Sequence, residues 1–368
     1  MISPLPVGKL PRELLAAILA RAPIDDPRVI LGPGVGLDCA VVDTGQRLAV
    51  YKSDPITFAT DQIGYYLVQV NANDIATTGA RPLWLLVTLL LPEKSTTAEL
   101  ADNIMAQIYD ACRGLGITVI GGHTEITAGL ERPIAIGTMI GDVARDQLVS
   151  PRGARAGDHV LLTKGVPIEA TALLSREFPA RLRDVMTVNE IEEAQNYLFR
   201  PGIGVTWDAR VAIEAGRVTA MHDPTEGGIV TALWELAEAS QKTLLVDPGN
   251  IPVPALARRV CEAFGIDPHS SIASGSLLIT APASDARAIS DALQNAGIAC
   301  ADIGAVAEGP AGVQRTTAAG FERWPWPAVD GVAKAFSEPQ SVNRFQLRAA
   351  MRGEGTDSTE AKGGQQCR

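Results

Sequence analysis

The order of apolar and polar residues along the chain predicts alternating helices and strands. Apolar residues three and four apart are typical of a helix with one buried face, and short continuous apolar runs are typical of buried strands. In the first part of the chain, helical spacing covers residues 11–21, 61–78 and 97–113, and strand-like runs cover 38–43, 47–51, 83–91, 117–120 and 133–143. Asp61 is expected to cap the second helix, which Gly79 and Pro82 end.

A second alternating series follows residues 144–158, a segment rich in Arg, Gly, Asp and Pro. It predicts helices over 168–177, 187–198, 206–215, 226–240, 252–264 and 284–296, and strands over 159–163, 218–221, 243–247, 276–281 and 300–307. From Ser337 the apolar content falls, which is typical of disorder. We therefore expect an α/β or α+β protein with domains 1–150 and 151–336 and a disordered tail, 337–368.

Composition narrows the class of protein. Hydrophobic residues make up 46% and charged residues 20% of the 368 residues, as in globular proteins. The net charge of −10 argues against nucleic-acid binding, and the apolar run Leu83–Leu91 is too short to span a bilayer as a helix. The start of the chain lacks a secretion signal, and the isolated cysteines contain no CxxC pair. We expect a soluble cytoplasmic protein.

Three aspartates lie in short polar segments of the first half. Asp38 follows Gly34 and Gly36, Asp54 follows the expected strand 47–51, and Asp74 lies in the expected helix. Carboxylate oxygens suit magnesium, and glycine-rich turns leave backbone amides for phosphates. Each segment also has a structural interpretation: a glycine turn, an Asp-Pro turn, or a solvated helix face.

Asn71 and Asn73 interrupt the apolar sequence of the helix that carries Asp74. Asn71 and Asp74 are three residues apart and share a helix face. The small residues Ala76, Gly79 and Ala80 that follow would permit close approach of a ligand or another chain segment. A solvated face is the alternative.

Two further polar clusters follow strand-like runs. Gly121-Gly122-His123-Thr124-Glu125 follows Thr118–Ile120, where glycine amides would be free for phosphate and Glu125 offers oxygen to magnesium. His123 is either a proton-transfer group, a metal contact or a hydrogen-bonded structural residue.

The second cluster, His222 to Gly228, opens the expected helix near Ile229. Amides at a helix start bind anions. Asp223 and Thr225 are alternatively caps, although Gly227 and Gly228 exceed what a cap requires.

Taken in this order, the segments resemble the aminoimidazole ribonucleotide (AIR) synthase, or PurM-like, superfamily of ATP-using enzymes. The matching pieces are Gly36 to Val41, Ser53-Asp54, Val70 to Pro82, Gly121 to Glu125, Met221 to Gly228 and Ser274 to Leu278. The sequences VNANDIATTGARP and MHDPTEGG look closest to the HypE branch, which serves hydrogenase maturation.

The resemblance implies a two-domain PurM-like fold whose N-terminal domain pairs with a second copy around a shared β-barrel. ATP and Mg²⁺ would lie in the cleft. The resemblance also implies one site with metal-binding, nucleotide-binding and catalytic residues. The metal ligands would be Asp38, Asp54, Asp74 and Glu125. The nucleotide would be bound by Gly36, Asn71, Asn73, Gly121, Gly122, Thr124, Thr225, Gly227 and Gly228. The catalytic residues would be His222, Asp223 and His123, with His222 as the acid or base.

The expected activity is ATP-driven phosphorylation of an amide or carbonyl oxygen, followed by dehydration or ligation. The substrate would be a small molecule or a carrier protein, with a maturation-complex protein as a further partner.

Two positions depart from the family pattern. Several relatives have Asp or Glu at the position of His123, and Cys367 lacks the Pro-Arg-Ile that precedes the terminal cysteine in HypE. Cys367 is either a carrier thiolate or a chance surface cysteine. A small-molecule kinase resembling thiamine-monophosphate kinase and a non-catalytic nucleotide-binding partner remain alternatives.

Overall fold

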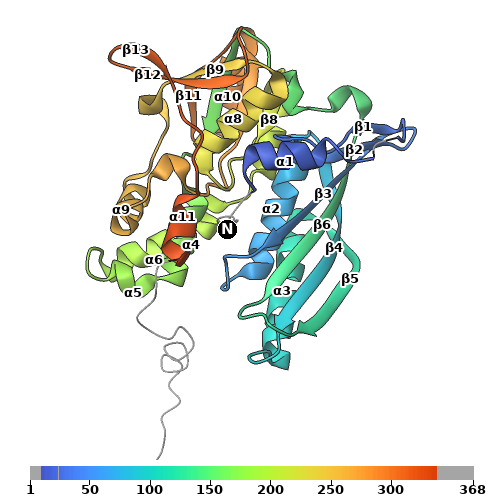
Figure 1. The fold of residues 1–368 in the computed structure, drawn as a ribbon, viewed down its shortest axis with the longest axis vertical. Coiled ribbons are helices and arrows are strands. Elements are labelled where there is room, and N and C mark those ends of the chain that lie inside the picture. Colours follow the sequence, from blue (N-terminus) through green and yellow to red (C-terminus); the bar gives the residue numbers. More distant parts are fainter. Residues whose placement is uncertain (1–9, 24, 338–368) are drawn as a thin grey trace, which may run out of the picture.

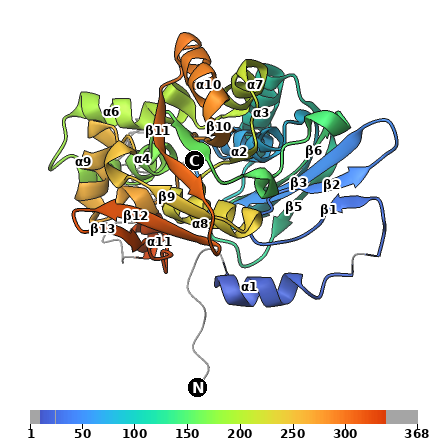
Figure 2. The same ribbon diagram turned by 90° about the horizontal axis from the view of Figure 1, so that it is seen from above.

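The protein contains two mixed β-sheets, one from each half of the chain (Figures 1 and 2). The computed structural model describes residues 10–23 and 25–337. Cys367 and nearly all of the expected tail lie outside these residues. No helix in the described part of the chain combines the length and apolar content needed to cross a bilayer.

The first sheet has six strands in the order β1-β2-β3-β6-β4-β5, of which only β4 and β5 pair in parallel. The strands are β1 (Val29–Leu31), β2 (Ala40–Asp43), β3 (Leu48–Ile56), β4 (Arg81–Pro92), β5 (Thr118–Thr127) and β6 (Ile134–Val143). Helix α2 (Ile63–Thr77) packs on β3 and β6, and α3 (Ala98–Leu115) packs on α2. Alternation along β6 buries Ala135 and Met139 beneath α2 and turns Ile136 and Ile140 to the other face.

The second sheet has seven strands in the order β13-β12-β9-β11-β7-β10-β8. They are β7 (Asp158–Thr163), β8 (Ala220–His222), β9 (Thr243–Val246), β10 (Leu278–Pro282), β11 (Cys300–Ala307), β12 (Gly312–Thr317) and β13 (Gly320–Arg323). Helices α7 (Thr206–Ala215) and α10 (Ala283–Asn295) share one buried cluster with Leu161 and Ile279, while α8 (Gly228–Ser240) shares another with Val160 and Leu162. Because neighbouring strand residues point to opposite faces, the sheet lies between these two helix layers.

The remaining helices join the two halves. They are α1 (Arg12–Leu19), α4 (Ile168–Glu177), α5 (Pro179–Leu182), α6 (Val188–Asn196), α9 (Ala255–Phe264) and α11 (Gly331–Ser337). Buried residues of α4, α6 and α9 belong to the same continuous apolar cluster as those of α2 and the first sheet. A shared core of this kind fixes how the halves face each other.

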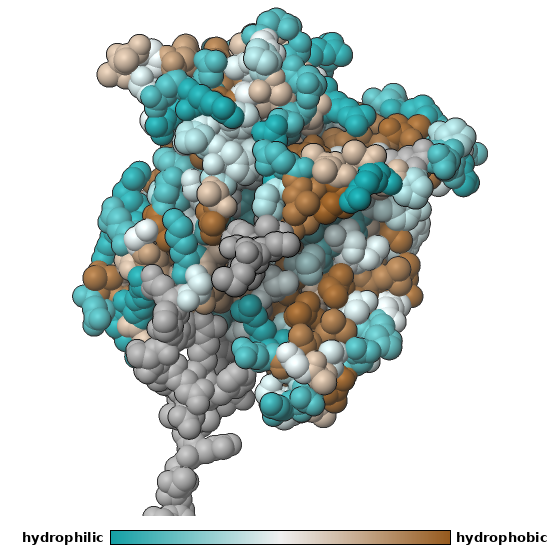
Figure 3. Space-filling model, in the orientation of Figure 1, coloured by the Kyte–Doolittle hydropathy of each residue, from teal (hydrophilic) through white to brown (hydrophobic). Residues whose placement is uncertain are grey.

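One face of the first sheet is left partly uncovered. Tyr51, Trp84 and Leu86 point away from α2 and expose 37%, 44% and 36% of their surface. Figure 3 shows apolar residues gathered in the part of the view where α1 and this sheet lie. Within the described residues the sheet is open, with β1 and β5 at its edges, so a single chain closes no barrel.

Three expectations about elements are wrong. The strand predicted to end at Tyr51 continues to Ile56, so Asp54 lies inside β3. Residues Gly121 to Glu125 lie within β5 rather than in a turn after it. Gln62 rather than Asp61 precedes α2, and Asp61 instead forms an ion pair with Arg176. The pattern also missed the short strands β1, β12 and β13.

Gly122 provides a test of this strand assignment. A Cβ at Gly122 would lie 1.8 Å from the Val87 carbonyl oxygen, and φ is +145°. Gly122→Ala is therefore expected to lower the free energy of unfolding by roughly 3 kcal/mol or more. Gly114→Ala is the control because nothing lies within 4 Å of its Cβ position in α3. It should stabilise by about 0.5–1 kcal/mol. Urea denaturation measures both, and equal stability of the two variants would contradict the strand geometry.

Candidate functional site

Lys52 lies among carboxylates between β3 and α2. Its Nζ is 3.3 Å from Asp54 Oδ2 and 3.1 Å from Asp74 Oδ2. Lys52 and Asp54 are two apart on a strand and therefore point to the same face, toward the helix that carries Asp74. Lys52 was not among the predicted site residues. Lys52 lies two residues before Asp54, and this spacing places both side chains on one face only because the strand continues past Tyr51.

The two asparagines of α2 position the backbone around this group. The Asp54 amide donates to Asn71 Oδ1 at 3.1 Å, and Asn71 Nδ2 donates to the Leu67 carbonyl at 2.9 Å. Asn73 Nδ2 donates to the Ile203 carbonyl, and the Val205 amide donates to Asn73 Oδ1, both at 2.8 Å. Both asparagines are buried and engaged by backbone. Asn73 thereby ties α2 to the second half.

His222 joins Asp38 to helix α8. Its Nδ1 lies 2.7 Å from Asp38 Oδ2 and its Nε2 lies 2.9 Å from Glu235 Oε2. Burial alone would lower the pKa of His222, but Asp38 and Glu235 outweigh it and raise that pKa well above its usual range. A protonated imidazole donates from both nitrogens, so His222 bridges two carboxylates as a cation.

Gly36 permits this arrangement. Its φ is +72°, and a Cβ there would lie 2.3 Å from the Glu235 carbonyl oxygen. The loop before Asp38 can therefore pack directly on α8 only with glycine at this position. This contact brings the Asp38 carboxylate from the first half against the His222 ring from the second.

Asp223 is the least compensated charge of the cluster. Both of its carboxylate oxygens are buried, and neither accepts a hydrogen bond from the described residues. Neighbouring Asp74 is the exception: its own pKa is raised well above the usual range, so it keeps its proton and donates it to the Asp223 carboxylate. Burial, reinforced by Asp38, raises the pKa of Asp223 to about 6, and burial also raises the pKa values of Asp74 and Asp54.

These carboxylates fit a divalent cation. Donor atoms of Asp38, His222 and Asp223 lie within 4.8 Å of one another. Mg²⁺ prefers oxygen ligands, which Asp38 and Asp223 supply here, and the ion pairs of Lys52 with Asp54 and Asp74 adjoin them. A cation there would stabilise the ionised form of Asp223, which burial disfavours.

The glycines at the start of α8 are structurally required. Gly227 has φ of +80°, and its amide donates to Asp330 Oδ2 at 2.5 Å. Gly228 has φ of +64°, and a Cβ there would lie 2.5 Å from the His269 carbonyl oxygen. The Gly228 amide donates to the Thr225 carbonyl at 2.9 Å. Both amides are thus used within the protein, and Asp330 was not foreseen.

Gly121 to Glu125 do not join the cluster within one chain. Asp54 pairs with Gly137, Gly137 with Val87, and Val87 with Gly122. Three strand spacings separate Asp54 from Gly122, about 14 Å. His123 and Glu125 are exposed on edge strand β5 and lie 3.1 Å apart, Nε2 to Oε2, and Thr124 is also exposed.

A second acidic group adjoins the cluster. Burial raises the pKa of Glu169 to about 8 despite hydrogen bonding from Ser274, and the carboxylates of Glu226 and Asp330 add to the rise. Glu169 Oε2 is buried without a hydrogen-bond partner among the described residues. Glu226 also raises the pKa of Asp54, so it lies between the two groups. No sequence pattern indicated Glu169, because it occupies an ordinary position in helix α4.

The two sheets and the helices around them form a two-domain α/β fold of the PurM-like class. Residues 36–143 match the AIR synthase related protein, N-terminal domain, and residues 155–315 match the AIR synthase related protein, C-terminal domain. The chain belongs to the AIR synthase-related family.

Relatives in the family include two proteins named carbamoyl dehydratase HypE. That of Bradyrhizobium diazoefficiens is 30% identical over 282 residues, covering 74% of this chain and 77% of the relative. That of Rhodobacter capsulatus is 29% identical over 301 residues, covering 78% and 83%.

Two solved structures share the fold. The hydrogenase maturation protein HypE in complex with ATP superimposes with a TM-score of 0.59 at 23% identity, covering 83% of this chain and 92% of that chain. ThiL complexed with AMPPCP and TMP gives 0.62 at 20% identity, covering 76% and 87%.

Glu169 should give stability a measurable pH dependence. Its pKa is about 8 in the fold, against 4.5 as the ordinary value, so the unfolded chain loses this proton first. The unfolded state is therefore increasingly favoured as pH rises from 4.5 to 8, and the effect levels off above 8. Glu169→Gln removes it, so the stability of the variant relative to the natural protein should rise by about 1–4 kcal/mol between pH 5 and 8.5.

Thermal unfolding across that pH range measures the difference. Exposed Glu93→Gln is the control and should leave the pH dependence unchanged. A Glu169→Gln profile parallel to that of the natural protein would show that this carboxyl group ionises normally.

Proposed function

We propose that this chain is an ATP- and Mg²⁺-dependent enzyme of the HypE-like branch that phosphorylates an amide or carbonyl oxygen of its substrate. The observation that carries the proposal is the fully buried carboxylate of Asp223 beside Asp38 and Asp74, a concentration of acidic groups that burial makes hard to ionise. Such a group is costly to bury unless a cation accompanies it. The ATP-complexed HypE structure, which shares the fold, supports a nucleotide as the ligand that such a cation would accompany.

In this proposal Mg²⁺ is held by carboxylate oxygens of Asp38, Asp54, Asp74 and Asp223. When bound, it neutralises triphosphate charge and orients the γ-phosphate. Lys52, 12% exposed between Asp54 and Asp74, holds those carboxyl groups in place and partly offsets the rise in their pKa values that burial causes. His222 fixes Asp38 through one ring nitrogen and α8 through the other. These residues position charge, which is most of what phosphoryl transfer requires of a protein.

Two alternatives give different products. A dehydratase or ligase releases inorganic phosphate, whereas a kinase like thiamine-monophosphate kinase leaves the phosphate on its product. Phosphorus NMR of a reaction with ATP, Mg²⁺ and an added carboxamide or alcohol distinguishes free phosphate from a phosphate ester. Nucleotide binding without turnover on either probe class would favour a non-catalytic maturation partner.

Asp223→Asn separates function from stability. Because burial raises the pKa of Asp223 to about 6, removing the carboxylate should raise the free energy of unfolding of the magnesium-free protein by about 1–3 kcal/mol at pH 8. The same change removes a proposed metal ligand and should weaken Mg²⁺-dependent ATP binding by about tenfold or more. Calorimetric titration and urea denaturation measure the two effects.

Asp110→Asn is the matched control, since this aspartate is 70% exposed on α3 and pairs with Arg113. It should change neither ATP binding nor stability beyond about 0.5 kcal/mol. Magnesium-dependent ATP binding that is undiminished in Asp223→Asn would remove the central support for the proposed site.

The proposal includes a second copy of the chain on the open face of the first sheet. Exposed Trp84, Leu86 and Tyr51 supply apolar area there, and edge strand β5 offers unpaired backbone groups. Pairing in this way would also place Gly121 to Glu125 against another chain, which accounts for their distance from the acidic cluster of their own chain.

Trp84→Glu tests this face. A charge at the centre of the apolar face should convert a dimer to a monomer in light scattering, because burying it unpaired is costly. Tyr109→Glu changes an equally exposed aromatic residue, 44% in each case, on α3 and should leave the dimer intact. A natural protein that is monomeric at micromolar concentration would refute the pairing.

A further inference from the structure

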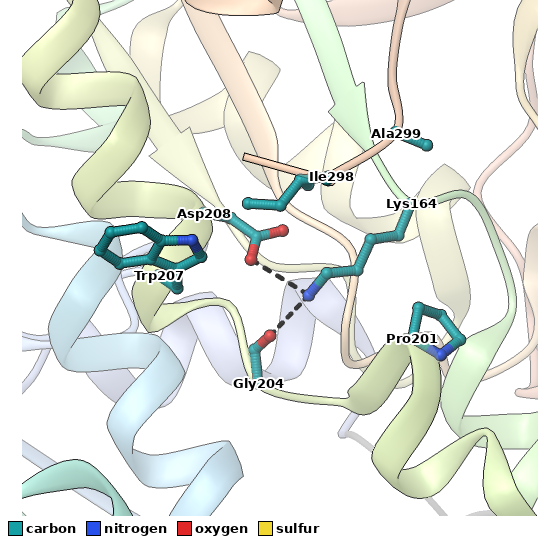
Figure 4. Close-up of a pocket in the computed structure, with 8 residues that line it drawn as sticks. Lys164, Pro201, Gly204, Trp207, Asp208, Ile298 and Ala299 are labelled. Carbon is teal, nitrogen blue, oxygen red and sulfur yellow. Dashed lines mark hydrogen bonds and ion pairs between the residues drawn. The ribbon is translucent and has the colours of Figure 1, made fainter. Parts of the chain in front are cut away.

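A cavity of about 340 Å³ opens in the second half of the molecule, and none of its lining residues belongs to the acidic cluster. It lies where the segment after β7, the start of α7 and the turn between α10 and β11 meet (Figure 4). Its volume is at the lower end of the range for small-molecule sites. No part of the proposed ATP chemistry uses it.

A buried ion pair forms the polar wall of this cavity. Lys164 and Asp208 have side chains only 8% and 3% exposed, and Nζ lies 3.1 Å from Asp208 Oδ2. Nζ also donates to the Gly204 carbonyl oxygen at 2.6 Å, while Thr163 Oγ1 donates to Asp208 Oδ1 at 2.8 Å. Asp208 is therefore fixed and neutralises the lysine.

Lys164 retains one donor. An ammonium group has three N–H bonds, and two are used by Asp208 and Gly204. Among the described residues no third acceptor bonds to Nζ. A buried ion pair is weak evidence of a stabilising role, and the fold also holds Lys164 at φ of +59°, a conformation unfavourable for lysine. The buried ion pair and the unfavourable backbone conformation of Lys164 both favour a role in ligand binding over a role in stability.

The other lining residues are apolar or glycine. Trp207 is 52% exposed, and Pro201, Ile298 and Ala299 also line the cavity. Figure 4 shows the Lys164 ammonium directed into the space between Asp208 and the Gly204 carbonyl, with Trp207 beyond Asp208. Arg210 lies over the Trp207 ring at 5.7 Å and restricts its orientation. An indole plane of this kind suits a planar ring.

We infer that this cavity binds a small planar molecule whose carboxylate or carbonyl oxygen accepts the remaining N–H of Lys164, and that its occupancy is felt at Asp74. An acceptor oxygen is required because Lys164 offers only donors. Full negative charge is not required, since Asp208 already compensates the ammonium.

The link to Asp74 runs through residues 203–205. Lys164 holds the Gly204 carbonyl, and Asn73 holds Ile203 and Val205 on either side of it. A Cβ at Gly204 would lie 2.4 Å from Gln69 Oε1, so this segment packs tightly on α2. A ligand that bonds to the third N–H of Lys164 reorients the ammonium group that holds Gly204, and so acts on the segment that positions Asn73, the neighbour of Asp74.

Fluorine NMR titration of the full chain with 4-fluorobenzoate, 4-fluorobenzamide and 4-fluorobenzylamine tests the cavity. Benzoate, benzamide or both should bind, and their relative affinity distinguishes an anionic from a neutral acceptor. The amine should bind at least tenfold more weakly than the better of them. Absence of binding by both oxygen ligands, or equal binding of the amine, would overturn the inference.

Two variants locate the binding. Lys164→Met should weaken it at least tenfold, whereas Lys242→Met, a surface lysine paired with Glu308, should not. Because Lys164→Met leaves Asp208 buried without its partner, Trp207→Ser provides a second test at a half-exposed position. It should also weaken binding at least tenfold. Binding that persists in a folded Trp207→Ser protein would place the probe elsewhere.

The link to Asp74 rests on the proposed function and is measured separately. A saturating probe should change the affinity of the natural protein for MgATP several-fold, and MgATP should change the affinity for the probe by the same factor. An unchanged MgATP affinity would refute the link. If the protein binds no MgATP, the proposed function fails, and the fluorine titrations still decide the cavity.

Discussion

The balance of charge around Lys52 constrains the rest of this structure. One ammonium, 12% exposed, lies between Asp54 and Asp74, and buried Asp223 adjoins the same group. Carboxylates gathered at this density repel one another and lose hydration, and burial raises the pKa values of all three aspartates. The fold therefore maintains a group that is short of positive charge, a state that a bound cation would relieve.

Close backbone contacts hold the charged groups in place. Gly36 rests on the Glu235 carbonyl of α8, Gly228 on the His269 carbonyl, and Gly204 on Gln69 of α2. Each contact joins segments distant in sequence, and two of them cross between the halves. The site is consequently built from backbone proximity as much as from side chains. This geometry explains why the glycines in the sequence lie beside the acidic residues.

The sequence predicted regular elements well where the apolar segments were long, whether spaced as in a helix or continuous as in a buried strand. Helices α2, α3 and α8 and strand β4 lie within a few residues of their expected bounds. It failed at Asp54-Pro55, which has the appearance of a turn. Beyond Tyr51 strand β3 no longer pairs with β2 and has only β6 as a strand neighbour, and proline is tolerated in such an edge segment. The prediction was also wrong at Gly121-Gly122, which lie inside a strand. Glycine is needed there because a side chain at Gly122 would collide with the Val87 backbone.

Lys52, Glu169 and Asp330 became visible only in three dimensions, because their partners are distant in the chain.

The Asp330 contact has a consequence for how the protein is made. Its carboxylate holds the Gly227 amide at the start of α8, and its other oxygen accepts from Val332. A ribosome delivers the amino-terminal half first. Both sheets are complete by Arg323, before Asp330 has been added. The loop that carries Asp223 is thus fastened only after the last strand has been synthesised, so both sheets can form before the site is finished.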